Sequence, residues 1–201
     1  MKGLPWWFVW RLLGVVFVIL VTTAPAAAEG PGALTAGTIA LGIAGGVSAS
    51  FNDPPDDSKT VYGYHGLLRL DAVVTDEQGV GVFRGNLEIG LQPMYIHLEA
   101  RPSADLYGGA LVTHWLLTGN GTLRPYLEVG GGITGGRAGR RTGNCDVNFI
   151  LEGGPGVLVF VGKHTAIDLG YRYHHISNGS RCGNDGYNSN MGVVGLSYFF
   201  N

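Results

Sequence analysis

The sequence predicts an all-β protein, an eight-stranded antiparallel β-barrel that follows a cleaved N-terminal signal peptide. Residues 1–28 have the character of an export leader, and the rest of the chain repeats apolar residues at every second position. Charged residues make up only 14% of the chain, whereas a soluble domain typically carries about 25%. The 45% hydrophobic content argues against disorder, and one domain suits a chain of 201 residues.

The first 28 residues contain the three parts of an export signal. Lys2 provides the positive start, residues 12–21 form an apolar run, and three alanines at 26–28 supply the small residues of a cleavage site. A retained membrane helix is the alternative, but the apolar run is shorter than the ~20 residues that a span needs. We therefore expect residues 1–28 to be removed and residues 29–201 to form the barrel.

Eight later runs show the period of two that indicates β-strands. In the fifth run, Leu127 and Val129 alternate with Tyr126 and Glu128, which gives the strand one apolar and one polar face. The predicted strands cover residues 33–50, 61–74, 80–92, 104–118, 122–135, 147–162, 164–178 and 188–200.

The polar faces of these runs carry charges of both signs in equal number. An eight-stranded barrel has an interior just wide enough for side chains, so a balanced ionic network could fill it while the apolar faces meet lipid. The alternative is an open sheet whose charges face water. The aromatic C-terminus YFFN favours an outer-membrane barrel, since such strands commonly end in aromatic girdles. The charges expected inside are Arg69, Asp71, Arg84, Glu88, Arg124, Glu128, Asp168 and Arg172.

The connections between the predicted strands alternate in length, as bacterial barrels with short periplasmic turns and longer external loops require. The short ones are residues 75–79, residues 118–122 and a turn at 162–164, and the longer ones follow the first, third, fifth and seventh runs. Both termini would then be periplasmic. The seventh run would end at the external surface, at the level of the outer leaflet.

Two of the long connections contain the cysteines, Cys145 and Cys182. An exported protein meets an oxidising compartment, so a disulfide between them is expected, with two unpaired thiols as the alternative. The same loops carry arginines, whose guanidinium groups pair well with phosphates such as those of outer-leaflet lipids. Solvated loop charges are the competing interpretation. These arginines are Arg137, Arg140, Arg141 and Arg181.

The seventh run places His175 and Ser177 on one face, because they are two residues apart and side chains two apart share a face. They lie on the same face as the apolar Tyr171 and Tyr173. A histidine and a serine arranged in this way can act as base and nucleophile. Placing them on an apolar face is costly unless the face has a use for them.

The stretch GYRYHHISNG, followed by NDGYNS and GLSYFF, resembles the C-terminal signature of the lipid A 3-O-deacylase family, the PagL type. The resemblance implies that Ser177 is the nucleophile and His175 the general base. It also implies that Asn178, with the backbone at Gly179, stabilises the oxyanion. Asn188 falls at the acid position of the triad, and an amide there can orient a neutral imidazole but cannot stabilise an imidazolium as a carboxylate does.

The resemblance further implies an exported outer-membrane esterase that removes the 3-O-linked hydroxyacyl chain from lipid A of lipopolysaccharide. Its partners would be lipopolysaccharide and other outer-membrane lipids, with a homodimer as one option and with no metal or other cofactor. A formal net charge of −2 and the lack of nucleotide-binding or zinc-finger spacings argue against nucleic acid as a partner. Two alternatives stay open: a non-catalytic structural or adhesive barrel, and an outer-membrane phospholipase or acyltransferase.

Overall fold

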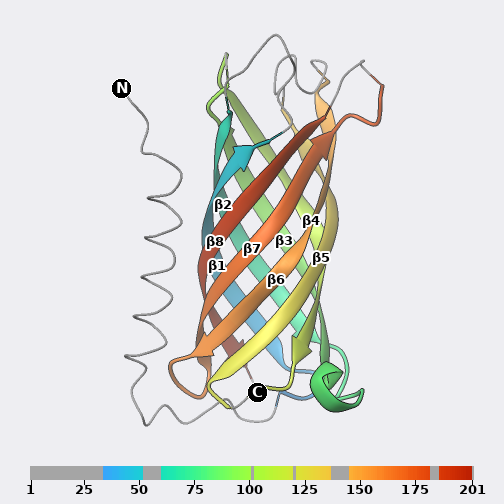
Figure 1. The fold of residues 1–201 in the computed structure, drawn as a ribbon, viewed down its shortest axis with the longest axis vertical. Helices are drawn as coiled ribbons and strands as arrows, with labels where there is room; N and C mark the ends of the chain where they lie inside the picture. Colours follow the sequence, from blue (N-terminus) through green and yellow to red (C-terminus); the bar gives the residue numbers. More distant parts are fainter. Residues whose placement is uncertain are drawn as a thin grey trace.

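The computed structural model describes residues 34–51, 60–100, 102–119, 121–136, 145–181 and 186–200, and these residues form a closed antiparallel barrel (Figure 1). Each strand pairs with the next in sequence, and β8 closes the barrel on β1. The expected signal peptide, residues 1–28, lies outside the described residues. The strands are β1 (Ile39–Ser50), β2 (Tyr62–Val73), β3 (Gly85–Leu98), β4 (Ala104–Leu117), β5 (Leu123–Gly135), β6 (Val147–Phe160), β7 (Thr165–Ser177) and β8 (Tyr187–Phe200).

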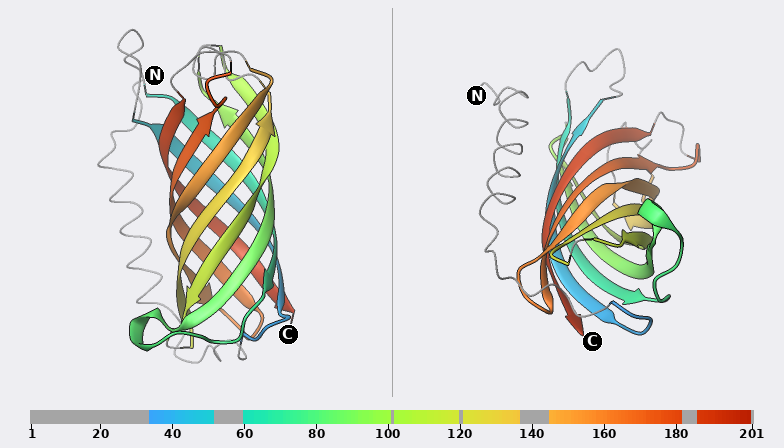
Figure 2. Two further views of the ribbon diagram at one scale, coloured as in Figure 1. Left: turned by 90° about the vertical axis from the view of Figure 1, so that its right-hand side faces the viewer. Right: turned by 60° about the horizontal axis from the view of Figure 1, so that its bottom comes forward.

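The two ends of the barrel carry different sets of connections (Figures 1 and 2). The upper end, as drawn in Figure 1, joins β1 to β2, β3 to β4, β5 to β6 and β7 to β8. The lower end carries the other three connections and the last residues of β8. A short 3-10 helix, η1 (Gly81–Phe83), lies at this lower end. Within the described ranges, no helix is long and apolar enough to cross a membrane.

The outer wall of the barrel is apolar, as the alternation predicted. The exposed side chains of the strands are dominated by Leu, Ile and Val, while their sequence neighbours point inward and are buried. This arrangement is the reverse of a soluble sheet sandwich and suits a barrel surrounded by lipid. Examples of the outward residues are Leu68, Leu70, Ile89, Leu91, Leu127, Val129, Val194 and Leu196.

The interior is filled with side chains in three layers. An apolar cluster that includes Ile96, Leu98 and Ile176 lies toward the upper end. A second cluster, with Leu116, Phe160 and others, lies toward the lower end. Charged residues occupy the region between them, where the apolar layers shield them from water. The sequence did not predict these apolar layers.

The third strand and one of the predicted interior charges differ from the prediction. The sequence predicts a strand from residue 80, but residues 81–83 form η1, and Val82 is 81% exposed. Gly79 and Gly81 adopt positive φ angles of 86° and 59°, which an extended strand does not allow. Arg84 therefore lies in the connection, 57% exposed and paired with Glu77 at 3.0 Å, and not inside the barrel.

The third strand also continues past residue 92, its predicted end, to Leu98. Pro93 has no N–H to donate, and the ladder between β2 and β3 is interrupted opposite it, between the Leu67–Met94 and Leu70–Leu91 pairs. On its other side β3 pairs with β4 without a break. The predicted alternation of short and long connections consequently fails here: residues 74–84 separate β2 from β3, whereas residues 99–103 suffice between β3 and β4.

Candidate active site

The upper end of β7 presents His175 and Ser177 on the outer wall of the barrel. Along this strand the inward residues Arg172, His174 and Ile176 are buried, whereas His175 and Ser177 are partly exposed. The two side chains thus share the lipid-facing side, as the sequence predicted. They lie near the last residues of the strand, at the upper end of the barrel.

Asn188 on β8 lies directly opposite His175 in the β-ladder and contacts it. The Asn188 Oδ1 atom lies 2.5 Å from His175 Nδ1 and also accepts a hydrogen bond of 2.6 Å from the Tyr173 hydroxyl. An amide oxygen only accepts hydrogen bonds, so Nδ1 of His175 carries the proton. The opposite ring nitrogen, Nε2, is then the one with a free lone pair, as a general base requires.

Tyr173 is a residue whose part in the site the sequence did not predict. It lies two residues before His175 on the same face, and the two rings are parallel within 5° with centroids 6.5 Å apart. Its hydroxyl holds the Asn188 amide with the oxygen toward the imidazole. The clue in the sequence was the Tyr-x-His-x-Ser spacing, which places all three side chains on one side of the strand.

Glycine brings the start of β8 close to both candidate catalytic residues. Gly186 has a positive φ of 65°, and a Cβ at this position would lie 3.0 Å from His175 Cε1 and 3.6 Å from Ser177 Cβ. His175 and Ser177 therefore border the same small space. Within the described part of the chain no direct hydrogen bond joins the Ser177 hydroxyl to the imidazole, and catalytic hydrogen bonds are often loose before substrate binds.

The backbone turns sharply immediately after Ser177. Gly179 and Ser180 both have a φ of 63°, and the Arg181 N–H donates to the Asn178 carbonyl at 3.4 Å. The Asn178 side chain is fully buried, in contrast to the partly exposed Ser177. Successive backbone N–H groups in such a turn can form an anion-binding concavity. The turn therefore offers backbone donors near Ser177, whereas the Asn178 amide is directed away from solvent.

Several predicted site residues lie outside the described residues: Arg137, Arg140, Arg141 and Cys182. Cys145 is buried, and the described residues include no free cysteine, while its pairing with Cys182 stays a prediction. Arg181 is exposed and lines a cleft with Cys145, Asp146 and Val147, beside the connection that follows β7.

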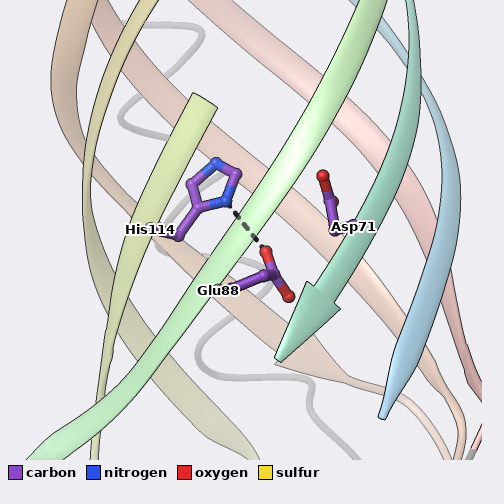
Figure 3. A group of neighbouring side chains, drawn as sticks. All are labelled: Asp71, Glu88 and His114. Atoms are coloured by element: carbon purple, nitrogen blue, oxygen red, sulfur yellow. Dashed lines mark ion pairs between the residues drawn. The ribbon is translucent and has the colours of Figure 1, made fainter. Parts of the chain in front are cut away.

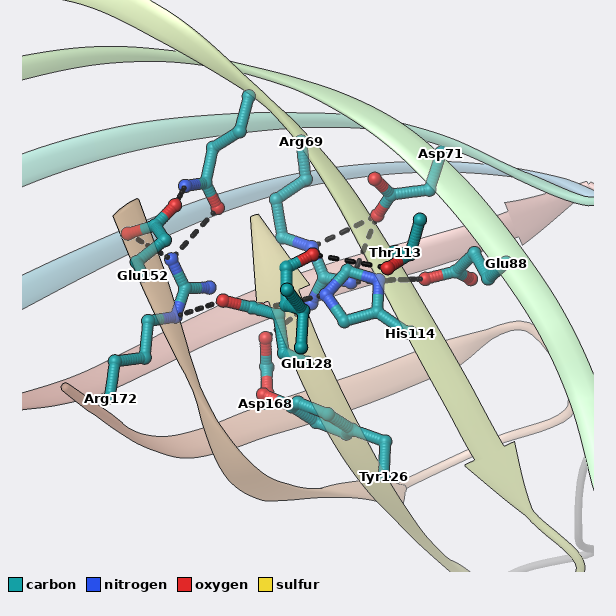
Figure 4. A network of polar contacts seen from close by, with 12 residues as sticks. Arg69, Asp71, Glu88, Thr113, His114, Tyr126, Glu128, Glu152, Asp168 and Arg172 are labelled. Carbon is teal, nitrogen blue, oxygen red and sulfur yellow. Dashed lines mark hydrogen bonds and ion pairs between the residues drawn. The ribbon is translucent and has the colours of Figure 1, made fainter. Parts of the chain in front are cut away.

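The middle of the barrel interior holds an ionic network that is separate from this outward site (Figure 4). Arg69 contacts three carboxylates: Asp71 at 2.9 Å, Glu88 at 3.2 Å and Asp168. All four side chains are almost completely buried. Buried charges need partners of this kind, because an unpaired ion in the interior costs several kcal/mol.

A second part of the network joins strands on the other side of the interior. His114 lies between Glu88 and Glu128, at 2.8 and 2.7 Å. Arg172 contacts Glu128 at 2.8 Å and Glu152 at 3.5 Å. The sequence predicted Arg172 and Glu128 inside the barrel but missed Glu152, because the Gly-rich sixth run alternates poorly.

Asp71, Glu88 and His114 place one potential ligand atom each within 4.8 Å of the others (Figure 3). In Figure 3 the imidazole of His114 is paired with Glu88, and Asp71 comes from the neighbouring strand. The Arg69 guanidinium contacts one oxygen of each carboxylate, so both carboxylates already have a cationic partner. We therefore interpret this cluster as part of the ionic network.

The closed barrel, with its apolar outer wall and its charged interior, defines a transmembrane β-barrel of the outer-membrane class. Within this class the chain belongs to the lipid A 3-O-deacylase (PagL) family, whose family model matches residues 62–197. The matched segment includes His175, Ser177 and Asn188.

Solved structures confirm the fold. The outer membrane enzyme PagL superposes with a TM-score of 0.53 at 20% sequence identity, covering 78% of this chain and 97% of that one. Neisserial surface protein A superposes with a TM-score of 0.52 at 16% identity, covering 81% and 97%. A search of curated proteins gave no match.

Proposed function

We propose that this protein is an outer-membrane serine esterase that removes the 3-O-linked hydroxyacyl chain from lipid A. The observation that carries the proposal is the contact of 2.5 Å between His175 Nδ1 and Asn188 Oδ1 on the lipid-facing wall, with Ser177 two residues further along the same face. Membership of the lipid A 3-O-deacylase family supports the substrate. An outward-facing site can reach an ester that is embedded in the membrane.

In the proposed reaction, His175 Nε2 takes the Ser177 proton while Oγ bonds to the ester carbonyl carbon. The tetrahedral intermediate collapses, the bond to the sugar oxygen at position 3 breaks, and the imidazolium returns its proton to that oxygen. Water, deprotonated by His175, then attacks the acyl-enzyme and releases a 3-hydroxy fatty acid. Ser177 regains its proton.

Backbone donors in the turn after Ser177 would stabilise the oxyanion in both steps, since preorganised N–H groups contribute most where charge develops. Gly179 allows the left-handed backbone of this turn. The Asn178 side chain could assist only if it left its buried position. In this proposal Asn178 therefore acts chiefly through its place in the turn.

A cleaved leader at 1–28 would export the chain, and the upper end of the barrel would face the outer leaflet. A Cys145–Cys182 disulfide would link the two connections next to the site. Arg181, with Arg137, Arg140 and Arg141, would contact the lipid A phosphates.

The test is the lipid A profile of bacteria that express the full chain, measured by mass spectrometry. The expected result is the loss of one hydroxyacyl group, abolished by Ser177→Ala. The matched control is Thr113→Ala, which removes an outward hydroxyl on β4. An unchanged profile from a folded barrel would favour a non-catalytic structural or adhesive role, which the amide at Asn188 makes the main rival. A change in phospholipid acyl chains would instead indicate a phospholipase or acyltransferase.

A further inference from the structure

The connection between β2 and β3, residues 74–84, is the longest of the three connections at the lower end of the barrel. Its far part, residues 79–84, contains η1 and presents three apolar side chains to the outside; we call it the apolar tip. These side chains are Val80, Val82 and Phe83, which are 83%, 81% and 69% exposed. Apolar side chains that are grouped and exposed in this way mark a surface that contacts a membrane or another protein.

The apolar tip projects sideways from the barrel wall. Figure 1 and both views in Figure 2 show η1 beside the lower rim, outside the strands. Trp115 on β4 connects the tip to the wall, because its indole N–H donates to the Phe83 carbonyl at 3.0 Å. The Trp115 side chain points outward, since its neighbours His114 and Leu116 are buried inside. The apolar tip is therefore a continuation of the lipid-facing wall.

Hydrogen bonds within the connection give the apolar tip a defined shape. Gln78 and Gly85 exchange two backbone hydrogen bonds of 2.7 and 2.8 Å at its base. Within the tip, two further backbone N–H groups donate to carbonyls three residues earlier, both at 3.2 Å. The Trp115 indole supplies a donor to a third carbonyl, that of Phe83. Unsatisfied backbone groups are what exclude irregular loops from lipid, so these contacts lower the cost of insertion.

The charged residues of the connection limit how deeply the tip can enter lipid. Arg84 is 57% exposed and pairs with Glu77 at 3.0 Å, and Glu77 also accepts a hydrogen bond of 2.9 Å from the Thr118 hydroxyl. An exposed ion pair of this kind remains at the level of the head groups and water. Tryptophan is enriched at the same level of a membrane, which agrees with the place of Trp115.

We propose that the apolar tip inserts Val80, Val82 and Phe83 into the membrane leaflet at the lower end of the barrel, where they contact phospholipid. In the orientation proposed above, this is the periplasmic leaflet. Removal of apolar side chains from water stabilises such an insertion. The strands form one continuous hydrogen-bonded wall, so an insertion that fixes the lower rim also fixes the level of the upper rim. The apolar tip would thus hold the outward site at a constant depth in the bilayer.

The experiment measures membrane depth with a nitroxide spin label on a single introduced cysteine, after Cys145 and Cys182 are replaced by serine. The labelled protein is reconstituted in vesicles of phosphatidylethanolamine and phosphatidylglycerol. Paramagnetic resonance then compares collisions with oxygen, which concentrates in lipid, and with a water-soluble nickel chelate. For Val82→Cys the ratio of oxygen to nickel collisions should be several-fold higher than for Lys163→Cys, an exposed residue of another lower connection. It should approach the ratio for Leu127→Cys on the lipid-facing wall.

A second substitution tests whether the apolar side chains cause the insertion. Phe83→Asp adds a charge to the tip and should shift the Val82→Cys label toward the ratio found for Lys163→Cys. The matched control is Gln78→Asp, which adds the same charge at the exposed base of the tip and should leave the ratio unchanged. Heat-modified mobility on gels shows whether each variant forms a closed barrel. If Phe83→Asp does not, Val80→Asp decides the question.

The proposal is overturned if nickel reaches the Val82→Cys label as readily as the Lys163→Cys label in the folded barrel. That result would leave the apolar tip in water, as a surface for a soluble protein. It is also overturned if the label stays in lipid in both Phe83→Asp and Val80→Asp. None of these measurements depends on esterase activity, so failure of the proposed function would leave the result unaffected.

Discussion

Replacing the Asn188 amide by a carboxylate of the same length should accelerate the proposed reaction. The Asn188 Oδ1 atom lies 2.5 Å from His175 Nδ1, so Asn188→Asp places an anion on the imidazole without moving the backbone. A glutamate at this position is one methylene longer and must bend away to avoid a clash. We therefore expect the aspartate to act more strongly than the glutamate.

The increase in kcat/KM expected for Asn188→Asp can be bounded from the geometry. A charge-assisted hydrogen bond is about twice as strong as a neutral one, which adds about 1 kcal/mol, or about fivefold in kcat/KM. The upper bound is the attraction between the carboxylate and the imidazolium of the transition state, about 4 kcal/mol at 4 Å, or roughly 10³-fold. Desolvation of the new carboxylate reduces this figure, so an increase between these bounds is expected.

The assay measures the release of 3-hydroxy fatty acid from lipid A by the purified barrel in mixed micelles. Asn190→Asp is the matched control, because Asn190 accepts a hydrogen bond of 2.6 Å from Tyr171 just as Asn188 does from Tyr173, without a histidine beside it. The control should leave the rate unchanged. If Asn188→Asp folds and gives the same rate or a lower one, Asn188 does not orient the base.

Three further predictions concern neighbouring residues and the interior. Tyr173→Phe removes the hydrogen bond that orients the amide and should lower kcat/KM about fivefold, whereas Tyr171→Phe should leave it unchanged in the same assay. Gly186→Ala adds a methyl group against the His175 imidazole at a residue with a positive φ. It should lower kcat by up to about 100-fold and the free energy of unfolding by about 1 kcal/mol. A fully active variant would contradict the proposed packing. Arg69→Met leaves three buried carboxylates without their cation and should cost about 3–5 kcal/mol in denaturant titrations, whereas Arg84→Met, which breaks an exposed pair, should cost less than about 1 kcal/mol.

The strand pattern was predictable because side-chain alternation is a local property. Leu127 and Val129 outside and Glu128 inside follow from the period of two alone. The same rule placed His175 and Ser177 outside. Where glycine or proline interrupts the pattern, prediction failed, as at Pro93 and at Gly81 in η1.

Features that depend on which strands become neighbours were not predictable from local patterns. The contact of His175 with Asn188 requires the register of β7 against β8, which the family resemblance suggested and the sequence alone did not provide. The approach of Gly186 to the imidazole depends on the path of the chain into β8. The contact of the Trp115 indole with the Phe83 carbonyl depends on the pairing of β3 with β4, which brings the connection before β3 beside the wall.

The buried network also affects the outward site, because both depend on the register of β7. A slip of one residue would turn Arg172 toward lipid and His175 toward the interior. Such a slip would break the contacts of Arg172 with Glu128 and Glu152 and leave those carboxylates buried without it. Breaking buried pairs of this kind costs about 3–5 kcal/mol, which is more than a hydrogen bond at the exposed end of the strand contributes. The interior ion pairs therefore fix the alternation that keeps His175 and Ser177 on the lipid-facing wall.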